Sequence, residues 1–338
     1  MTAGKATGIL LKYVLPPVIT VGLCWMLLRD IDLDEMRRVV AEDCAAGWLL
    51  ASLALNVAAQ VARAARWRFQ LRALGIRPSM WLTTLSVFGT YAVNLVFPRL
   101  GEVWRTGFIA RRERAQFSTV FGSMVADRLS DTVCVGLLTL LAFVLAGPQL
   151  KAYLAQDPDR MERVMAIAGS PWLWGAVAAC VAGAVWMLTR RPTNKLVARV
   201  RGFVAGLWEG FAVLKGMPGL GWWLLLTCGL WASYFFGLGC ALMAFPLTAE
   251  VLATGGLTAL LICFVVSSLS MAVPSNGGIG PYQWALMWAL SLYAPAVEGL
   301  TWNYTAIVAN TIMAATTIML ILLGILTFGW IALSPSRK

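Results

Sequence analysis

Long apolar segments are the feature that most constrains how this chain folds. Six of them have the roughly 20 residues that an α-helix needs to cross a bilayer, and they cover residues 9–28, 46–65, 120–146, 171–189, 222–245 and 302–333. Hydrophobic residues make up 59% of the 338 residues and charged residues only 13%, which is outside the range of soluble domains. The segments lack the alternation of a transmembrane β-barrel. The sequence therefore predicts an all-α fold, a polytopic transmembrane helical bundle with a single membrane domain over residues 1–338.

Missing residue types exclude several classes of enzyme. The chain has no histidine, which excludes His-based catalytic triads and histidine metal ligands. Its seven cysteines are scattered without C-x-x-C spacing, so they form neither a disulfide framework nor a metal site. The phosphate-binding loop motif of nucleotide hydrolases is also missing. We therefore predict that the protein is not an enzyme and has no cofactor, no metal and no catalytic residues.

Charged residues between the apolar segments predict the orientation of the helices. Residues 29–45 contain six acids and three arginines, whereas residues 63–77 contain five arginines and no acid. Because basic loops are retained in the cytoplasm, we place both termini there, in a bacterial cytoplasmic (inner) membrane. A full crossing by the apolar residues 79–97 would translocate the five arginines between positions 99 and 114. We therefore expect a re-entrant hairpin that turns near Pro98 and returns to the cytoplasmic side.

The second half of the chain repeats this arrangement. The apolar residues 252–273 are followed by a Gly/Pro-rich segment and by the short apolar segment 284–294; a re-entrant hairpin and two full spans both fit the charges there. A shift of about 176 residues, the spacing between Pro98 and Pro274, aligns residues 46–65 with 222–245. Because the halves would face opposite ways, we predict an inverted-topology repeat with two Gly/Pro-broken hairpins, its halves being residues 1–150 and 151–338. In transporters such breaks mark the substrate site.

Charged residues near the first break are the strongest candidates for a binding site. In NLVFPRLGEVWR, residues 94–105, we expect Glu102 to pair with Arg99 or Arg105, and a helix after Gly101 to present free N–H groups to an anion. In ADRLSD, residues 126–131, Asp127 and Asp131 share one helix face. Ionisable groups at this depth favour pairing inside the bundle, here with Arg99 or Arg105. An ion-pair network without a role in transport and a proton-coupling site are the alternatives.

The second break, PSNGGIGPYQ at residues 274–283, carries no charge but offers neutral hydrogen-bonding groups; a simple loop is the alternative reading. The predicted substrate-binding residues of both breaks are Asn94, Arg99, Glu102, Arg105, Asp127, Arg128, Asp131, Ser275, Asn276, Gly277, Gly278, Tyr282 and Gln283.

Residues 194–216 have the spacing of an amphipathic helix on the inner leaflet. The net charge of +11 is therefore assigned to anionic lipid and to topology, with no nucleic acid as partner.

The order of three motifs resembles a known family over nearly the whole chain. N-x-x-x-P-R-L-G-E-x-x-R, then D-R-x-x-D, then P-S-N-G-G-I-G-P-Y-Q are similar to the motifs of the lysylphosphatidylglycerol synthase transmembrane, or flippase-like, family. The resemblance implies a protein that moves or handles lipids, such as aminoacylated phosphatidylglycerol, hopanoid-related lipids or polyprenyl-linked glycans. The lysyl-transferring members carry a soluble catalytic domain after the membrane part; we expect none here, and the transferase activity is not carried over. Tyr282 and Gln283 stand where the family commonly has an acidic residue.

These observations predict a lipid flippase or transporter that binds the anionic headgroup of a phospholipid or polyprenyl-phosphate lipid and moves it between leaflets. The first alternative is a non-transporting membrane subunit that binds anionic lipid and scaffolds or regulates a biosynthetic enzyme; a homo-oligomer is a further expectation. The second alternative is a membrane-embedded transferase that uses Glu102, Asp127 and Asp131 on a lipid-linked substrate.

Overall fold

The computed structural model describes residues 33–145, isolated positions between 147 and 182, residues 219–273 and residues 275–334. The predicted helices 9–28 and 194–216, and Pro274, lie outside these residues, and only isolated positions of the predicted helix 171–189 are described. The chain divides into two compact units, residues 1–142 with 217–338, and residues 143–216. The candidate site lies in the first unit.

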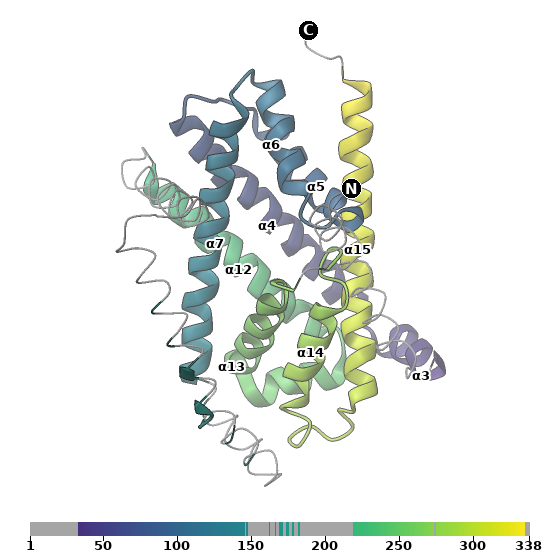
Figure 1. The fold of residues 1–338 in the computed structure, drawn as a ribbon. Coiled ribbons are helices and arrows are strands. Elements are labelled where there is room, and N and C mark those ends of the chain that lie inside the picture. The colour runs from purple at the N-terminus through teal and green to yellow at the C-terminus, as the bar shows by residue number, and fades with distance from the viewer. Residues whose placement is uncertain are drawn as a thin grey trace, which may run out of the picture. The chain divides into compact units, whose positions relative to one another are not determined.

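All regular elements in the described ranges are helices, and most are apolar (Figure 1). Their order is α3 Leu33–Arg38, η2 Val39–Asp43, α4 Ala46–Ala73, α5 Met80–Val96, α6 Gly101–Arg112, α7 Phe117–Leu145, α12 Leu220–Met243, α13 Pro246–Ser270, α14 Pro281–Ser291 and α15 Trp302–Leu333. Five helices, α4, α7, α12, α13 and α15, are long and apolar enough to cross a membrane. The predicted all-α, polytopic helical bundle is therefore confirmed.

Helix α4 is longer than the sequence predicts, and this is the main correction to the helix boundaries. The apolar segment ends at residue 65, but the helix continues to Ala73 and ends before Gly75, which has a left-handed φ of 80°. The arginines of residues 63–72 are thus helical residues and not only a charged loop. Two of them, Arg63 and Arg66, are buried, which is tolerated because carboxylates from α7 neutralise them.

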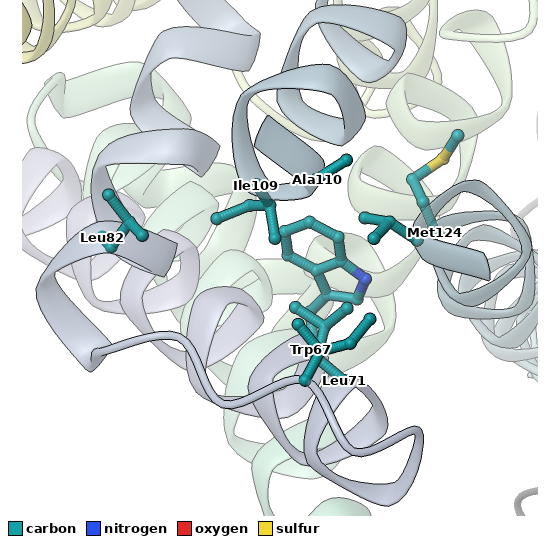
Figure 2. Packing of buried hydrophobic residues seen from close by; sticks show 8 residues of the cluster. Trp67, Leu71, Leu82, Ile109, Ala110 and Met124 are labelled. Carbon is teal, nitrogen blue, oxygen red and sulfur yellow. The ribbon is translucent and has the colours of Figure 1, made fainter. Parts of the chain in front are cut away.

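A hydrophobic cluster holds together the end of α4, the start of α5, the end of α6 and the start of α7. Figure 2 shows Trp67 of α4 at its centre, between Leu82 of α5, Ile109 of α6 and Met124 of α7. The Trp67 Nε1–H donates to Ser123 Oγ of α7 at 3.1 Å. Because α5 begins and α6 ends in the same cluster, α6 returns to the end of the bundle at which α5 started. We call α5, α6 and the turn 97–100 between them the first hairpin.

The second hairpin, α13 and α14 with the turn 271–280, opens at the other end of the bundle. Helix α13 starts beside the start of α4, where the Ala45 N–H donates to the Ala244 carbonyl at 2.8 Å. A methyl group placed on Gly299, after α14, would lie 3.6 Å from Leu247 Cδ1 at the start of α13. The chain therefore returns after α14 toward the end at which α13 began. Gly256, with φ 58° and ψ −148°, breaks α13 near its middle.

The turns of the two hairpins contact each other. A methyl group placed on Gly277 would lie 2.7 Å from Leu95 Cδ2, at the end of α5. Arg99 Nη2 donates to the Ala272 carbonyl at 3.0 Å. Gly277 and Arg99 both have left-handed φ angles, 61° and 60°. The two irregular segments, 170 residues or more apart in the sequence, are thus packed against each other.

Candidate functional site

Buried ion pairs join α4 to α7 at the centre of the candidate site. Arg66 Nη2 lies 2.7 Å from Asp127 Oδ1 and 2.8 Å from Asp131 Oδ1. Arg63 pairs with Asp131 through its Nη1, which also lies 3.9 Å from Asp127 Oδ2. The side chains of Arg66 and Asp127 are fully buried. The spacing of three residues on α4 and four on α7 puts each pair on one helix face, so two guanidinium groups meet two carboxylates.

Helix α6 adds Glu102 and Arg105 to this network, and α7 adds Arg128. Arg128 Nη2 of α7 donates to Glu102 Oε1 at 3.1 Å, and Arg128 Nη1 lies 3.5 Å from Asp131 Oδ2. Asn94 of α5 donates to Glu102 Oε2 at 3.3 Å. We call the seven residues of this network the charge cluster: Arg63, Arg66, Glu102, Arg105, Asp127, Arg128 and Asp131.

Arg105 is the least paired member of the charge cluster. Its side chain is fully buried, and its nearest carboxylate oxygen is Asp127 Oδ2 at 4.0 Å. Its guanidinium carbon lies 4.2 Å from the centre of the Trp67 ring. None of its three guanidinium nitrogen atoms has a hydrogen-bond acceptor among the described residues. Arg105 therefore presents a buried cation with unused donors on one side and an aromatic face on the other.

The carboxylates of the charge cluster act as counter-ions. Asp127 and Asp131 each lie within 4.0 Å of three guanidinium groups. Removal of either carboxylate would leave buried guanidinium groups uncompensated, which costs several kcal/mol.

The structure corrects the predicted partners of the first motif. Glu102 pairs with Arg128 and Asn94, not with Arg99 or Arg105. Of the two arginines expected to pair with the aspartates, Arg105 lies 4.0 Å from Asp127, whereas Arg99 is exposed, contacts the second hairpin and forms no ion pair with Asp127 or Asp131 among the described residues. The Arg99 guanidinium instead donates to the Ala272 carbonyl at 3.0 Å. The first N–H of α6, on Gly101, donates to Asn94 Oδ1 at 2.8 Å and is not free for an anion.

The residues of the second motif form a separate, uncharged group. Gln283 Oε1 accepts from the Gly280 N–H at 2.7 Å, and Gln283 Nε2 donates to Asn310 Oδ1 of α15 at 3.3 Å. Gly277 and Gly278 have left-handed φ angles and lie against Leu95 and Met271. The other predicted residues, Ser275, Asn276 and Tyr282, are half-buried beside them. The second hairpin is linked to the first through the turns, where Arg99 Nη2 donates to the Ala272 carbonyl.

Sequence reasoning missed Arg63, Arg66 and Trp67 of α4. The signal for the arginines was available, because two aspartates on one face of an apolar helix need cationic partners at the same depth. Nothing in the sequence marks Trp67 as the partner of Arg105. A second missed contact is the pair of hydroxyl groups of Tyr91 on α5 and Tyr234 on α12, 3.3 Å apart, with the Arg63 guanidinium 6.0 Å from the Tyr234 ring.

Comparison with known proteins adds one match. The family model described as the lysylphosphatidylglycerol synthase TM region matches residues 13–324. No curated protein and no solved structure matches the chain significantly. The match covers both hairpins and the charge cluster.

Proposed function

Because the chain belongs to the lysylphosphatidylglycerol synthase transmembrane-region family, we propose that it is a lipid flippase. It binds the anionic, phosphate-bearing headgroup of a membrane lipid or lipid-linked precursor and moves it between the leaflets. Membership in the family relates the chain to lipid synthesis or flipping in a membrane, and the proposal takes the second of these.

The observation that carries the proposal is the meeting of two broken hairpins beside buried charges. Irregular backbone at membrane depth is tolerated only where protein or a wet cavity surrounds it. The two turns, joined by Arg99 and Leu95, belong to hairpins that open at opposite ends of the bundle. Movement of one turn against the other would open the charge cluster to one side of the membrane at a time, as in transporters built from inverted repeats.

The charges at the two ends of the bundle support an orientation. One end, formed by the end of α4 and the start of α5, carries Arg68, Arg72, Arg77, Arg111, Arg112 and Arg114 with a single acid, Glu113. The other end carries Asp34, Glu35, Glu42, Asp43, Glu250 and Glu298 with Arg37 and Arg38. The positive-inside rule puts the arginine-rich end in the cytoplasm of a bacterial inner membrane, so the first hairpin enters from the cytoplasm and the second from outside.

The pairing of the carboxylates favours a binding role over catalysis. A general base needs a carboxylate that is free to take a proton, but Glu102, Asp127 and Asp131 are all held by guanidinium groups. Arg105 and the half-buried Arg128, in contrast, supply planar donors that suit phosphate oxygens. Arg99 at the turn, on the surface, would contact the headgroup first.

Transport in proteoliposomes tests the proposal. Purified protein is reconstituted with a fluorescent phosphatidylglycerol, and the loss of fluorescence to an impermeant quencher reports movement between leaflets. We expect movement by the unchanged protein and at least a tenfold loss in Arg105→Gln, corresponding to about 1.4 kcal/mol or more of lost interaction. Arg111→Gln, which removes an exposed arginine at the end of the same helix, is the matched control and should transport normally.

Three outcomes would overturn the proposal. Copurified lipid and a stable enzyme partner without movement would favour the scaffolding subunit. Formation of a modified lipid in detergent micelles, where flipping has no meaning, would favour a transferase. Full transport by Arg105→Gln, with unchanged elution on size-exclusion chromatography, would mean that the charge cluster does not bind the transported lipid.

A further inference from the structure

The charge balance of the cluster points to the charge of its ligand, an inference that rests on the proposed function. Four guanidinium groups, from Arg63, Arg66, Arg105 and Arg128, face three carboxylates, from Glu102, Asp127 and Asp131. Among the described residues the cluster therefore has one positive charge in excess. We infer that the site is matched to a headgroup with one negative charge at its phosphate, a phosphodiester, and discriminates against phosphomonoesters and diphosphates.

The distances place the excess charge on Arg105. Arg66 has carboxylate oxygens at 2.7 and 2.8 Å, Arg63 is in direct contact with Asp131, and Arg128 has one at 3.1 Å. Arg105 has none closer than 4.0 Å. Its Nε, Nη1 and Nη2 atoms are buried without a protein acceptor in the described part of the chain. A buried donor without an acceptor costs about 1–3 kcal/mol, and more when it is charged, so these atoms form the place where an external anion gains most.

Burial makes the number of charges matter. In a solvated site a second negative charge would be screened by water and ions, but here the side chains of Arg66, Arg105 and Asp127 are fully buried. One anionic charge neutralises the excess. A second would be a net charge at membrane depth, which costs several kcal/mol. A phosphodiester carries one charge at neutral pH, whereas a phosphomonoester carries about 1.5 to 2.

Charged groups elsewhere do not change this balance. Arg99 is on the exposed turn and its guanidinium donates to the Ala272 carbonyl. Gln283 of the second hairpin and Asn310 of α15 are neutral and bonded to each other. Glu102 is the one carboxylate of the cluster on α6, and its only cationic partner within the described ranges is Arg128. Removal of its charge should therefore raise the excess from one to two without breaking the α4–α7 ion pairs.

Native mass spectrometry of the detergent-solubilised full chain tests the inference with three probes that share dioleoyl chains: phosphatidylglycerol with one charge, phosphatidic acid with one to two, and uncharged diacylglycerol. We expect the unchanged protein to retain phosphatidylglycerol about tenfold better than phosphatidic acid, a ratio that corresponds to about 1.4 kcal/mol. Glu102→Gln should reverse this preference. Glu113→Gln makes the same substitution directly after α6, outside the cluster, and should leave the ratio unchanged.

Three results would overturn the inference. The first is a preference of the unchanged protein for phosphatidic acid, and the second is an unaltered ratio in a folded Glu102→Gln. Arg105→Gln should weaken retention of both anionic lipids toward that of diacylglycerol, and the third result is retention of the anionic lipids by this variant at the level of the unchanged protein. The transport assay separates the two proposals. Charge-selective retention without movement between leaflets would refute the flippase and leave the charge match standing, whereas movement without charge selectivity would do the reverse.

Discussion

In both hairpins a side chain accepts a hydrogen bond from a backbone N–H at the break, but the two hairpins differ in charge. In each, an amide side chain satisfies the backbone at the break: Asn94 Oδ1 accepts from the Gly101 N–H at 2.8 Å, and Gln283 Oε1 accepts from the Gly280 N–H at 2.7 Å. The amide nitrogens then diverge, since Asn94 donates to the carboxylate of Glu102 and Gln283 donates to the neutral Asn310. The first hairpin is thereby joined to the ionic network through Glu102, and the second hairpin is joined to the neutral side chain of Asn310 on α15.

This difference suggests a division of labour. A turn that adjoins buried ion pairs is held in place by them, because any movement that separates the charges is costly. A turn held by neutral hydrogen bonds and by glycines at positive φ, such as Gly277 and Gly278, is cheaper to displace. We therefore assign ligand binding to the first hairpin and the larger movement to the second. The following predictions test this contrast, beginning with the largest expected effect.

The sidedness of the hairpins should be opposite and complete. In a cysteine-free background, a cysteine at Arg111 after the first hairpin should be labelled only from the cytoplasm, and a cysteine at Glu298 after the second only from outside. The reason is that residues 99–114 carry five arginines, which resist translocation. An impermeant maleimide on intact cells and on inverted vesicles measures both. Labelling of the Arg111 site on intact cells would contradict the first hairpin and with it the inverted repeat.

Loss of a buried counter-ion should be the most destabilising substitution. Asp127→Asn removes the charge that faces Arg66 at 2.7 Å and Arg63 and Arg105 at 3.9 and 4.0 Å. We expect the free energy of unfolding to fall by about 3–5 kcal/mol, the usual cost of removing one partner from a buried pair. Denaturant titration of the purified protein in detergent measures it.

Glu250→Gln, at an exposed position near the start of α13, is the matched control for the loss of a carboxylate charge and should change stability by less than about 0.5 kcal/mol. An equal effect of both substitutions would mean that the buried ion pairs between α4 and α7, beside which the first hairpin lies, do not stabilise the bundle.

The sequence predicts the fold better than it predicts the site, for a physical reason. Length and hydropathy determine which segments can span a bilayer, so α15 was predicted at residues 302–333 and has those bounds. The end of α4 was predicted wrongly because Arg63 and Arg66 read as a charged loop until their partners on α7 are known. Hydropathy averages over side chains and cannot show that a charge is neutralised by one 65 residues away.

The charge cluster itself was predicted in part. Depth and spacing were enough to choose Glu102, Arg105, Asp127, Arg128 and Asp131, which the structure brings together. The expected contact of Asp127 with Arg105 is present at 4.0 Å, but the closer pairs with Arg63 and Arg66 were missed because these arginines follow the apolar part of α4. The inverted repeat, the halves 1–150 and 151–338, and the role of the second motif stay predictions.

Added bulk at the first turn should have an intermediate effect. A methyl group on Gly101 would lie 2.1 Å from the Thr90 carbonyl oxygen of α5, a backbone atom that cannot rotate away. We expect Gly101→Ala to lower the free energy of unfolding by about 1–3 kcal/mol, as overpacking does. On the same helix, a methyl group on Gly107 meets nothing within 4 Å, so Gly107→Ala should be neutral or stabilising. Thermal unfolding of both variants compares them, and a smaller loss in Gly101→Ala than in Gly107→Ala would disprove the close contact of α5 and α6.

The smallest effect should come from the neutral contact of the second hairpin. Asn310→Leu removes the acceptor of the 3.3 Å hydrogen bond from Gln283 and the donor of a 2.8 Å bond to the Ala306 carbonyl of its own helix, but it leaves the bond between Gln283 and the Gly280 N–H. Each neutral hydrogen bond contributes about 0.5–1.5 kcal/mol. We expect the loss of stability beyond that of the control below to lie in that range, independent of salt because no charge is involved. Thr311→Val, one position along α15, removes only a hydroxyl that donates to the Ile307 carbonyl of its own helix, and it controls for the loss of a polar group on α15. If Asn310→Leu lowered stability as much as Asp127→Asn, the second turn would be held as firmly as the first, and the assignment of the larger movement to it would be wrong.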